Sequence, residues 1–202
     1  LKAMRICELG EFDFLTALSQ KRLNFAYSEL SLLGALERRS SSDNSTIRDN
    51  HDDYSITSFG REMAKLPLEP ELAHFFLKAC ELKCPHEGAA LAAMLTIQDK
   101  FDSTSVFFLQ NSGSDAVRLQ RRFWMEEGDH LTLLSIFMSY LKNSGSSVKL
   151  CQKYRLNLRN LLAAHRLYST LLKYTKFNTS NVSLLSPMEI AVVIRKCLIS
   201  AY

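Results

Sequence analysis

The apolar positions of this chain recur at helical spacing over most of its length. In the first such stretch, residues 21–36, apolar side chains return at steps of three and four, which predicts an amphipathic helix. Its predicted core positions are Leu23, Ala26, Tyr27, Leu30 and Leu33. Later runs predict helices at 71–82, 86–97, 115–123, 129–142, 149–173 and 187–199. Because the segments between them are short and polar, the chain is predicted to be mainly α-helical and to form a bundle.

A polar segment interrupts this pattern near the start of the chain. Residues 40–53 are polar and charged without periodicity, which predicts a long loop. The short alternating stretches on either side, 35–38 and 54–57, are predicted to pair as a small β-hairpin with this loop at its tip. A helix followed by a two-stranded wing is the pattern of a winged helix.

Two prolines mark the predicted domain boundary. Pro67 closes one helix and Pro70 opens the next, since proline is accepted in the first turn of a helix but not in its interior. The prediction is a winged-helix-like domain at 1–68, with its N-terminal part missing, and a helical domain at 69–202. The chain begins without Met and stops within an apolar helical pattern, so it is expected to be a region excised from something longer.

Two helix starts carry recognisable signals. Ser186, Pro187 and Glu189 occupy the N-cap, first and third positions of a capping box. In the stretch GDHLTLL, Asp129 and His130 are adjacent, so their side chains diverge by about 100° on a helix and do not suit an acid-base pair. We instead predict a structural role, in which Gly128 frees the backbone and Asp129 caps the helix.

Composition and motifs exclude several classes of protein. Hydrophobic residues at 47% and charged residues at 23% are typical of an ordinary globular chain. No apolar run approaches the ~20 residues of a membrane-spanning helix, and no secretory signal is visible. Glycine-rich phosphate loops, the G-x-S-x-G elbow and the H-E-x-x-H motif are all missing from the sequence. The chain itself is therefore expected to hold no catalytic site and no nucleotide.

The cysteines favour core packing over metal binding. Cys80, Cys84 and His86 lie close in sequence, but they are one ligand short of a structural zinc site, and Cys80 lies near Phe76 and Leu77. We predict no metal site. Five scattered cysteines also suit a reducing compartment.

Basic residues supply the candidate binding sites. On one unbroken helix, four cations fall within about 40° of one another, opposite an apolar side: Arg155, Arg159, Arg166 and Lys173. Such a stripe is either a solvated helix face or a surface that follows nucleic-acid phosphates. Arg121 and Arg122 precede Phe123 and Trp124, a composition that suits single-stranded nucleic acid and equally a partly buried helix end.

Several blocks of the chain resemble, in order, the helicase-associated region of DEAH-box RNA helicases, as found in pre-mRNA splicing and ribosome biogenesis. The blocks are LKAMRI…FDFL, LSLLGALE, TSFGREMAKLPLEPEL, AALAAMLTIQDKF, RRFWMEEGDHLTLLSIF and LCQKYRLNLRNLLAAHRL. This resemblance covers nearly the whole chain. It differs from the family pattern at Thr16 to Ser19, where a proline-rich run is usual, at Leu150, where Trp is usual, and at Tyr168, where Arg is expected.

The resemblance implies a winged-helix domain followed by a helical ratchet domain that leads towards an oligonucleotide-binding-fold domain. It also implies that ATP and Mg²⁺ belong to motor domains outside this chain, that the parent protein is an ATP-dependent helicase, and that it is nuclear. The implied partners are single-stranded RNA, held through Arg159 and its neighbours, and the motor and oligonucleotide-binding-fold domains of the parent chain. The alternative is a docking site for a glycine-patch activator protein or another spliceosomal partner.

Overall fold

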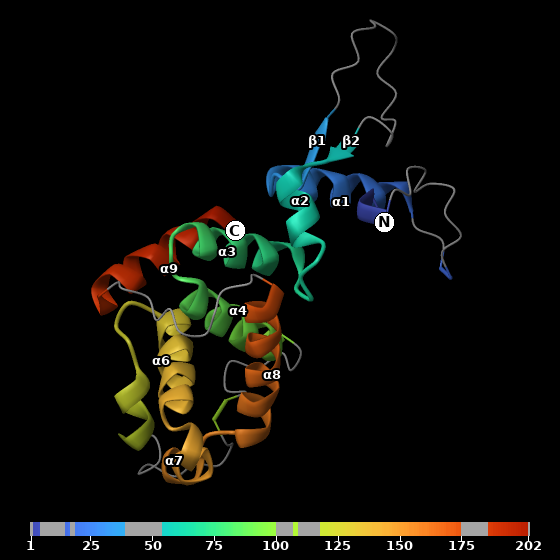
Figure 1. The fold of residues 1–202 in the computed structure, drawn as a ribbon. Coiled ribbons are helices and arrows are strands. Elements are labelled where there is room, and N and C mark those ends of the chain that lie inside the picture. Colours follow the sequence, from blue (N-terminus) through green and yellow to red (C-terminus); the bar gives the residue numbers. More distant parts are fainter. Residues whose placement is uncertain are drawn as a thin grey trace, which may run out of the picture. The chain divides into compact units, whose positions relative to one another are not determined.

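The computed structural model describes residues 2–4, 15–16, 19–38, 54–99, 107–108, 118–174 and 186–201. The chain divides into two compact units, Leu1–Glu71 and Leu72–Tyr202, and each is described by itself (Figure 1). The assignment of residues 1–68 and 69–202 as two domains of named type stays a prediction.

The first unit contains helix α1, a two-stranded sheet and the short helix α2. A 3-10 turn, η1 (Lys2–Met4), precedes α1 (Gln20–Leu32), and β1 (Leu36–Arg38) pairs antiparallel with β2 (Tyr54–Ile56). The hairpin prediction is confirmed, while its predicted tip at 40–53 lies outside the described residues. The first helix ends four residues before the predicted Leu36, because Gly34 has φ +68 and the chain then enters β1.

The core of the first unit joins α1 to the sheet. Leu23, Tyr27 and Leu36 are buried together, and Tyr54 packs against them with its ring centroid 5.0 Å from that of Tyr27. The predicted core position Ala26 is wrong, since it lies on the exposed side of α1.

Thr57 connects the sheet to α2 (Ser58–Met63). Its hydroxyl donates to the carbonyl oxygen of Gly34 at 2.7 Å and accepts the N–H of Gly60 at 2.9 Å, so it is the N-cap of α2. Helix α2 thereby approaches the backbone of Ala35 so closely that a Cβ at residue 60 would lie 2.1 Å from the Ala35 carbonyl oxygen.

The second unit is helical, and α4 (Pro85–Asp99) is its central element. Residues 89–94 of α4 are fully buried on every side, because α6 (Asp129–Lys142) and α8 (Leu158–Tyr174) pack against it, with α9 (Pro187–Ala201) nearby. Figure 1 shows these helices around α4. Helix α3 (Pro70–Glu81) comes close at Gly88, where an added Cβ would meet the Ala79 Cβ at 2.4 Å. A mainly helical chain is confirmed.

The predicted helix at 149–173 is wrong in one respect, because it is broken into two. Helix α7 (Ser147–Tyr154) follows the 3-10 turn η4 (Ser144–Ser146) and ends at Arg155, which adopts left-handed backbone angles of φ 53 and ψ 43. The N–H of Leu156 donates to the Cys151 carbonyl at 2.9 Å, which closes a Schellman motif. The side chain of Asn157 then accepts the N–H of Asn160 at 3.3 Å and starts α8.

Two other predicted helices match the structure differently. The capping box is confirmed at α9, where the Ser186 N–H donates to Glu189 Oε2 at 2.7 Å and the Glu189 N–H donates to Ser186 Oγ at 3.3 Å. The helix predicted at 115–123 is described only from residue 118, as a helical turn that continues into the 3-10 turn η3 (Arg121–Phe123).

Candidate nucleic-acid interface

One face of α8 carries three exposed cations. Arg159, Arg166 and Lys173 lie seven residues apart, so successive members differ by only about 20° around the helix. The opposite face of α8 is fully buried at Leu161, Ala164 and Leu171. Since Lys173 also lies in the last turn, its charge is favourable at the negative end of the helix dipole. The structure thus brings together three of the four predicted stripe residues.

Arg155 does not belong to this face, and its predicted place in the stripe is wrong. The stripe assumed one unbroken helix, but Arg155 sits in the left-handed turn between α7 and α8. Its side chain is exposed, yet the break removes the helical phase that would align it with Arg159.

Tyr168 belongs to the packed side of α8. It lies about 200° around the helix from Arg166, and its hydroxyl oxygen is 2.9 Å from Nδ1 of His86 on α4. Burial raises the pKa of the Tyr168 phenol, so the group stays neutral near pH 7. Position 168 therefore contributes packing between α4 and α8 instead of a cation.

Arg121 and Trp124 form a surface pair beside η3. The guanidinium carbon of Arg121 lies 5.7 Å from the centroid of the Trp124 ring, and Trp124 is 54% exposed. An exposed indole with a cation next to it is chemically suited to stacking with an unpaired base.

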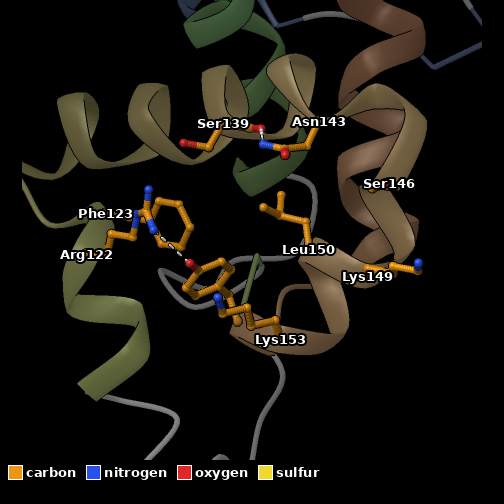
Figure 2. Close-up of a pocket in the computed structure, with 9 residues that line it drawn as sticks. Arg122, Phe123, Ser139, Asn143, Ser146, Lys149, Leu150 and Lys153 are labelled. Atoms are coloured by element: carbon orange, nitrogen blue, oxygen red, sulfur yellow. Dashed lines mark hydrogen bonds between the residues drawn. The ribbon is translucent and has the colours of Figure 1, made fainter.

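Arg122 points the other way and lines a pocket with residues of α6 and α7. The pocket has a volume of about 290 Å³, and Figure 2 shows Arg122 and Phe123 on one side of it, Leu150 on the other, and Ser139 with Asn143 above. Its remaining lining residues are Ser146, Lys149, Lys153 and Tyr154. Three of the nine lining residues are cationic and none is acidic, so the pocket favours an anion.

Tyr154 holds this pocket together. Its hydroxyl accepts a hydrogen bond of 3.0 Å from Nη1 of Arg122, and its ring meets Phe123 edge to face with centroids 5.1 Å apart. The Lys153 ammonium lies 5.3 Å from the centroid of the same ring, and the Gln120 side chain donates to the Tyr154 carbonyl at 3.3 Å.

Sequence reasoning missed Lys149, Lys153 and Tyr154 as candidate site residues. A signal for the lysines was present, because residues 130–188 contain no Asp or Glu at all. The same segment contains Lys142, Lys149, Lys153, Arg155, Arg159, Arg166, Lys173 and Lys176. The modest net charge of +4 for the whole chain hides this one-sided distribution.

The start of α6 differs from the prediction in its cap. Gly128, at φ 128, is the N-cap residue, and Asp129 is already the first helical residue and makes no side-chain capping bond. The predicted cap at Asp129 is therefore wrong. The prediction for Gly128 agrees with the structure, because its φ of 128 is a backbone conformation that favours glycine. Thr132 secures the turn instead, because its hydroxyl oxygen accepts the Met125 N–H at 3.0 Å. Asp129 and His130 are both exposed.

Four free thiols lie among the described residues of the second unit, and three of them are buried. Cys84, Cys151 and Cys197 are buried, and burial raises the pKa of Cys80 to about 12. A thiol held protonated as Cys80 is makes a poor nucleophile and a poor metal ligand, whereas a hydrogen bond with Cys84 lowers the pKa of Cys197. Within the described ranges, no three His, Cys, Asp or Glu side chains are placed to hold a metal ion. In the same ranges, no helix has the length and apolar character needed to cross a membrane.

The chain is similar to known helicases and to one of their domains. Residues 69–133 match the model of the helicase associated domain (HA2), ratchet-like. ATP-dependent RNA helicase DHX33 of Mus musculus is 31% identical over 80% of the chain, and probable ATP-dependent RNA helicase DHX35 of Homo sapiens is 32% identical over 81% of it. The probable ATP-dependent RNA helicase DHX35 homolog of Caenorhabditis elegans is 29% identical over 100% of the chain.

The aligned part is 21% of the length of the mouse and human proteins and 25% of the nematode one, so the chain spans about a fifth to a quarter of these curated relatives. The family match includes α3, α4 and η3 and ends within the first turns of α6. Residues 69–133 therefore hold a helicase-associated, ratchet-like domain, and the chain is homologous to the region of DEAH-box ATP-dependent RNA helicases that carries it.

Proposed function

We propose that this chain is the winged-helix and ratchet part of a DEAH-box ATP-dependent RNA helicase and that it helps to hold single-stranded RNA. The observation that carries the proposal is the face of α8, on which Arg159, Arg166 and Lys173 are exposed within a segment free of acidic residues. Cations at regular spacing along a helix can each neutralise a phosphate of a strand lying beside it.

In this proposal ATP and Mg²⁺ bind to motor domains of the parent protein, which convert hydrolysis into movement along the RNA. The described helices give the strand a fixed cationic surface, so that motor closure displaces the strand relative to it. Helix α1 and the hairpin of the first unit support the winged-helix part of the proposal, and an oligonucleotide-binding-fold domain is the proposed neighbour of α9. A role in pre-mRNA splicing and a nuclear location complete the proposal.

A salt series of RNA binding tests this function. The chain is titrated with a fluorescent oligouridylate at several salt concentrations, beside the variants Arg166→Ala and Lys196→Ala. Binding weakens as salt rises, so log K falls with log salt concentration. Each lost phosphate contact reduces the steepness of this fall by about 0.7 for a single strand. Arg166→Ala is expected to weaken binding and to flatten the slope by about this amount.

Lys196→Ala is the matched control, because Lys196 is also an exposed cation on a helix of the second unit but lies on α9. It removes the same charge from the chain and is expected to leave the slope nearly unchanged. Equal effects of the two substitutions would mean that only net charge matters, and they would refute a defined RNA surface on α8.

A second candidate function is docking of a protein partner, such as a glycine-patch activator, on the first unit. Phe25 and Leu32 are 67% and 79% exposed and lie seven residues apart, on one side of α1. Exposed apolar side chains that gather in this way are typical of interaction sites. The double substitution Phe25→Ser with Leu32→Ser should abolish binding of a synthetic glycine-patch peptide while leaving the affinity for RNA unchanged. Unchanged peptide binding would eliminate this candidate.

A further inference from the structure

We propose that the pocket between η3, the end of α6 and α7 binds one phosphate group of single-stranded RNA. This inference rests on the proposed function and deepens it, because it adds a second contact, in a pocket, to the exposed face of α8. The residues that carry it are Arg122 and Lys153, with Leu150 as the apolar side of the pocket.

The pocket offers hydrogen-bond donors and positive charge without a competing carboxylate. Beside its three cations, it is lined by the hydroxyls of Ser139 and Ser146. The acidic residues nearest in sequence to Phe123 are Glu126, Glu127 and Asp129, and none of them lines the pocket. Arg122 Cζ and Lys153 Nζ lie 5.9 Å and 5.3 Å from the centroid of the Tyr154 ring, whereas the Lys149 side chain extends away from them in Figure 2. An anion placed between Arg122 and Lys153 would relieve the repulsion between these two cations. A phosphate group is the anion that RNA provides.

Arg122 is held in position before any ligand arrives. One edge of its guanidinium donates to the Tyr154 hydroxyl at 3.0 Å, and that tyrosine is itself buried against Phe123. A guanidinium has five N–H donors, so the bond to Tyr154 leaves others free for a phosphate oxygen. Because the side chain is already ordered, binding costs less conformational entropy than it would at a mobile arginine.

The apolar side of the pocket strengthens these charges. Leu150 is half-buried and Phe123 is buried, so a phosphate between them and the cations would be partly removed from water. Charge interactions are stronger where the effective dielectric constant is lower. The volume of about 290 Å³ lies near the lower end of the range for ligand pockets, which suits a single phosphate with its attached sugar better than a large ligand.

The surroundings favour RNA over a phosphorylated protein as the source of that phosphate. Trp124 follows directly after two of the lining residues, Arg122 and Phe123, and it presents an exposed ring beside Arg121. Trp124 does not line the pocket, but an exposed aromatic two residues from a phosphate-binding arginine is suited to stack a base of the same strand. The acid-free segment also continues from the pocket lysines into α8, along which further phosphates could bind.

Two pocket variants test the proposal. Leu150→Trp places a larger side chain in the pocket and leaves every charge in place, and Lys149→Ala with Lys153→Ala removes charge from exposed positions without touching the core. The full chain and both variants are titrated with a fluorescent decameric oligouridylate across a salt series. Thermal denaturation of each variant verifies that it is folded.

The expected result is weaker RNA binding in both variants. The double lysine variant should lose about 0.7 from the salt slope, the value for one phosphate, and it should lose affinity equally for all sequences. In a parallel titration with inorganic phosphate followed by amide NMR shifts, residues 122, 150 and 154 should respond in the unaltered chain and not in the double lysine variant.

The outcomes separate this proposal from the proposed function. If both pocket variants bind RNA as tightly as the unaltered chain while Arg166→Ala weakens binding, the pocket proposal is overturned and the role of α8 stands. If the pocket variants weaken binding and Arg166→Ala does not, the pocket is supported and the role of α8 falls. If a phosphoserine peptide competes for the pocket and RNA does not, RNA is the wrong source of the phosphate.

Discussion

The guanidinium of Arg122 donates a hydrogen bond of 3.0 Å to the hydroxyl oxygen of Tyr154, which joins η3 to the last residue of α7. The same tyrosine accepts at its carbonyl from Gln120 and packs its ring on Phe123. Three contacts therefore join Gln120, Arg122 and Phe123 to one residue, of which the first is to its backbone carbonyl and the other two are to its side chain. Because the pocket lies where these segments meet, its shape depends on this tyrosine more than on any cation that lines it.

Tyr154→Phe tests this dependence. The substitution keeps the buried ring and removes the hydroxyl that accepts from Arg122, so we expect a loss of unfolding free energy of about 0.5–1.5 kcal/mol, as for one hydrogen bond. The released guanidinium can turn to solvent, which should also weaken the response to inorganic phosphate. Urea unfolding measures the first effect and amide NMR the second. A variant as stable as the original chain, with an unchanged phosphate response, would show that Arg122 needs no support from Tyr154.

Gly60→Ala should destabilise the first unit. The added Cβ would lie 2.1 Å from the carbonyl oxygen of Ala35, and a backbone atom of a paired segment cannot move aside as a flexible side chain can. Overpacking of this kind costs on the order of 1–3 kcal/mol. Hydrogen exchange should therefore become faster in α1 and β1, without change in α4 or α8.

Gly145→Ala is the matched control for this substitution. No atom lies within 4 Å of an added Cβ at residue 145, so exchange should stay as it is throughout the described helices. Slow exchange of α1 in the Gly60→Ala variant would mean that α2 can shift away from Ala35 at little cost.

Arg155→Gly should leave the second unit as stable as before or make it more stable. Residue 155 has φ 53 and ψ 43, which costs a residue with a side chain about 1–2 kcal/mol, whereas glycine adopts these angles freely. Glycine also gives the unfolded chain more freedom, which costs about 0.5–1 kcal/mol, so the net gain should lie between zero and about 1.5 kcal/mol. Urea unfolding should rank Arg155→Gly above Arg155→Ala, which removes the same charge and keeps the strain. The reverse order would show that Arg155 is not strained.

Strong local signals explain where sequence reasoning succeeded. The helix predicted at 129–142 has the same bounds as α6, and the capping box at Ser186 and Glu189 is present with both of its hydrogen bonds. The hairpin at residues 36–38 and 54–56 was also found from its alternation. The helix and the capping box depend on residues a few positions apart, and each strand shows its alternation locally, so a single sequence contains these signals even though the paired strands are 16 to 20 positions apart.

The break between α7 and α8 could not be read with the same ease. Arginine rarely adopts left-handed backbone angles, so Arg155 does not signal a helix end in the sequence. A glycine at this position would have predicted one. The visible sign was Asn157, a favoured N-cap residue, which in fact caps α8. The pocket was hidden for a different reason, since its lining comes from residues 122–154 and becomes a site only when η3, α6 and α7 meet.

The start of α9 should loosen as the pH falls. Hydrogen bonds from the Ser186 backbone N–H and then from its side chain hold the pKa of Glu189 below its usual range. A carboxyl whose pKa is lowered by folding stabilises the folded form above its unfolded pKa of about 4.3, and this contribution is lost as the pH falls through the lower folded value. We therefore expect the amides of residues 187–190 to exchange faster, relative to those of α4, near pH 3 than near pH 6. Glu189→Ala, which removes the acceptor, should show the fast exchange at both pH values, and a Glu189→Ala variant that behaves like the original chain would contradict the capping role of the carboxylate.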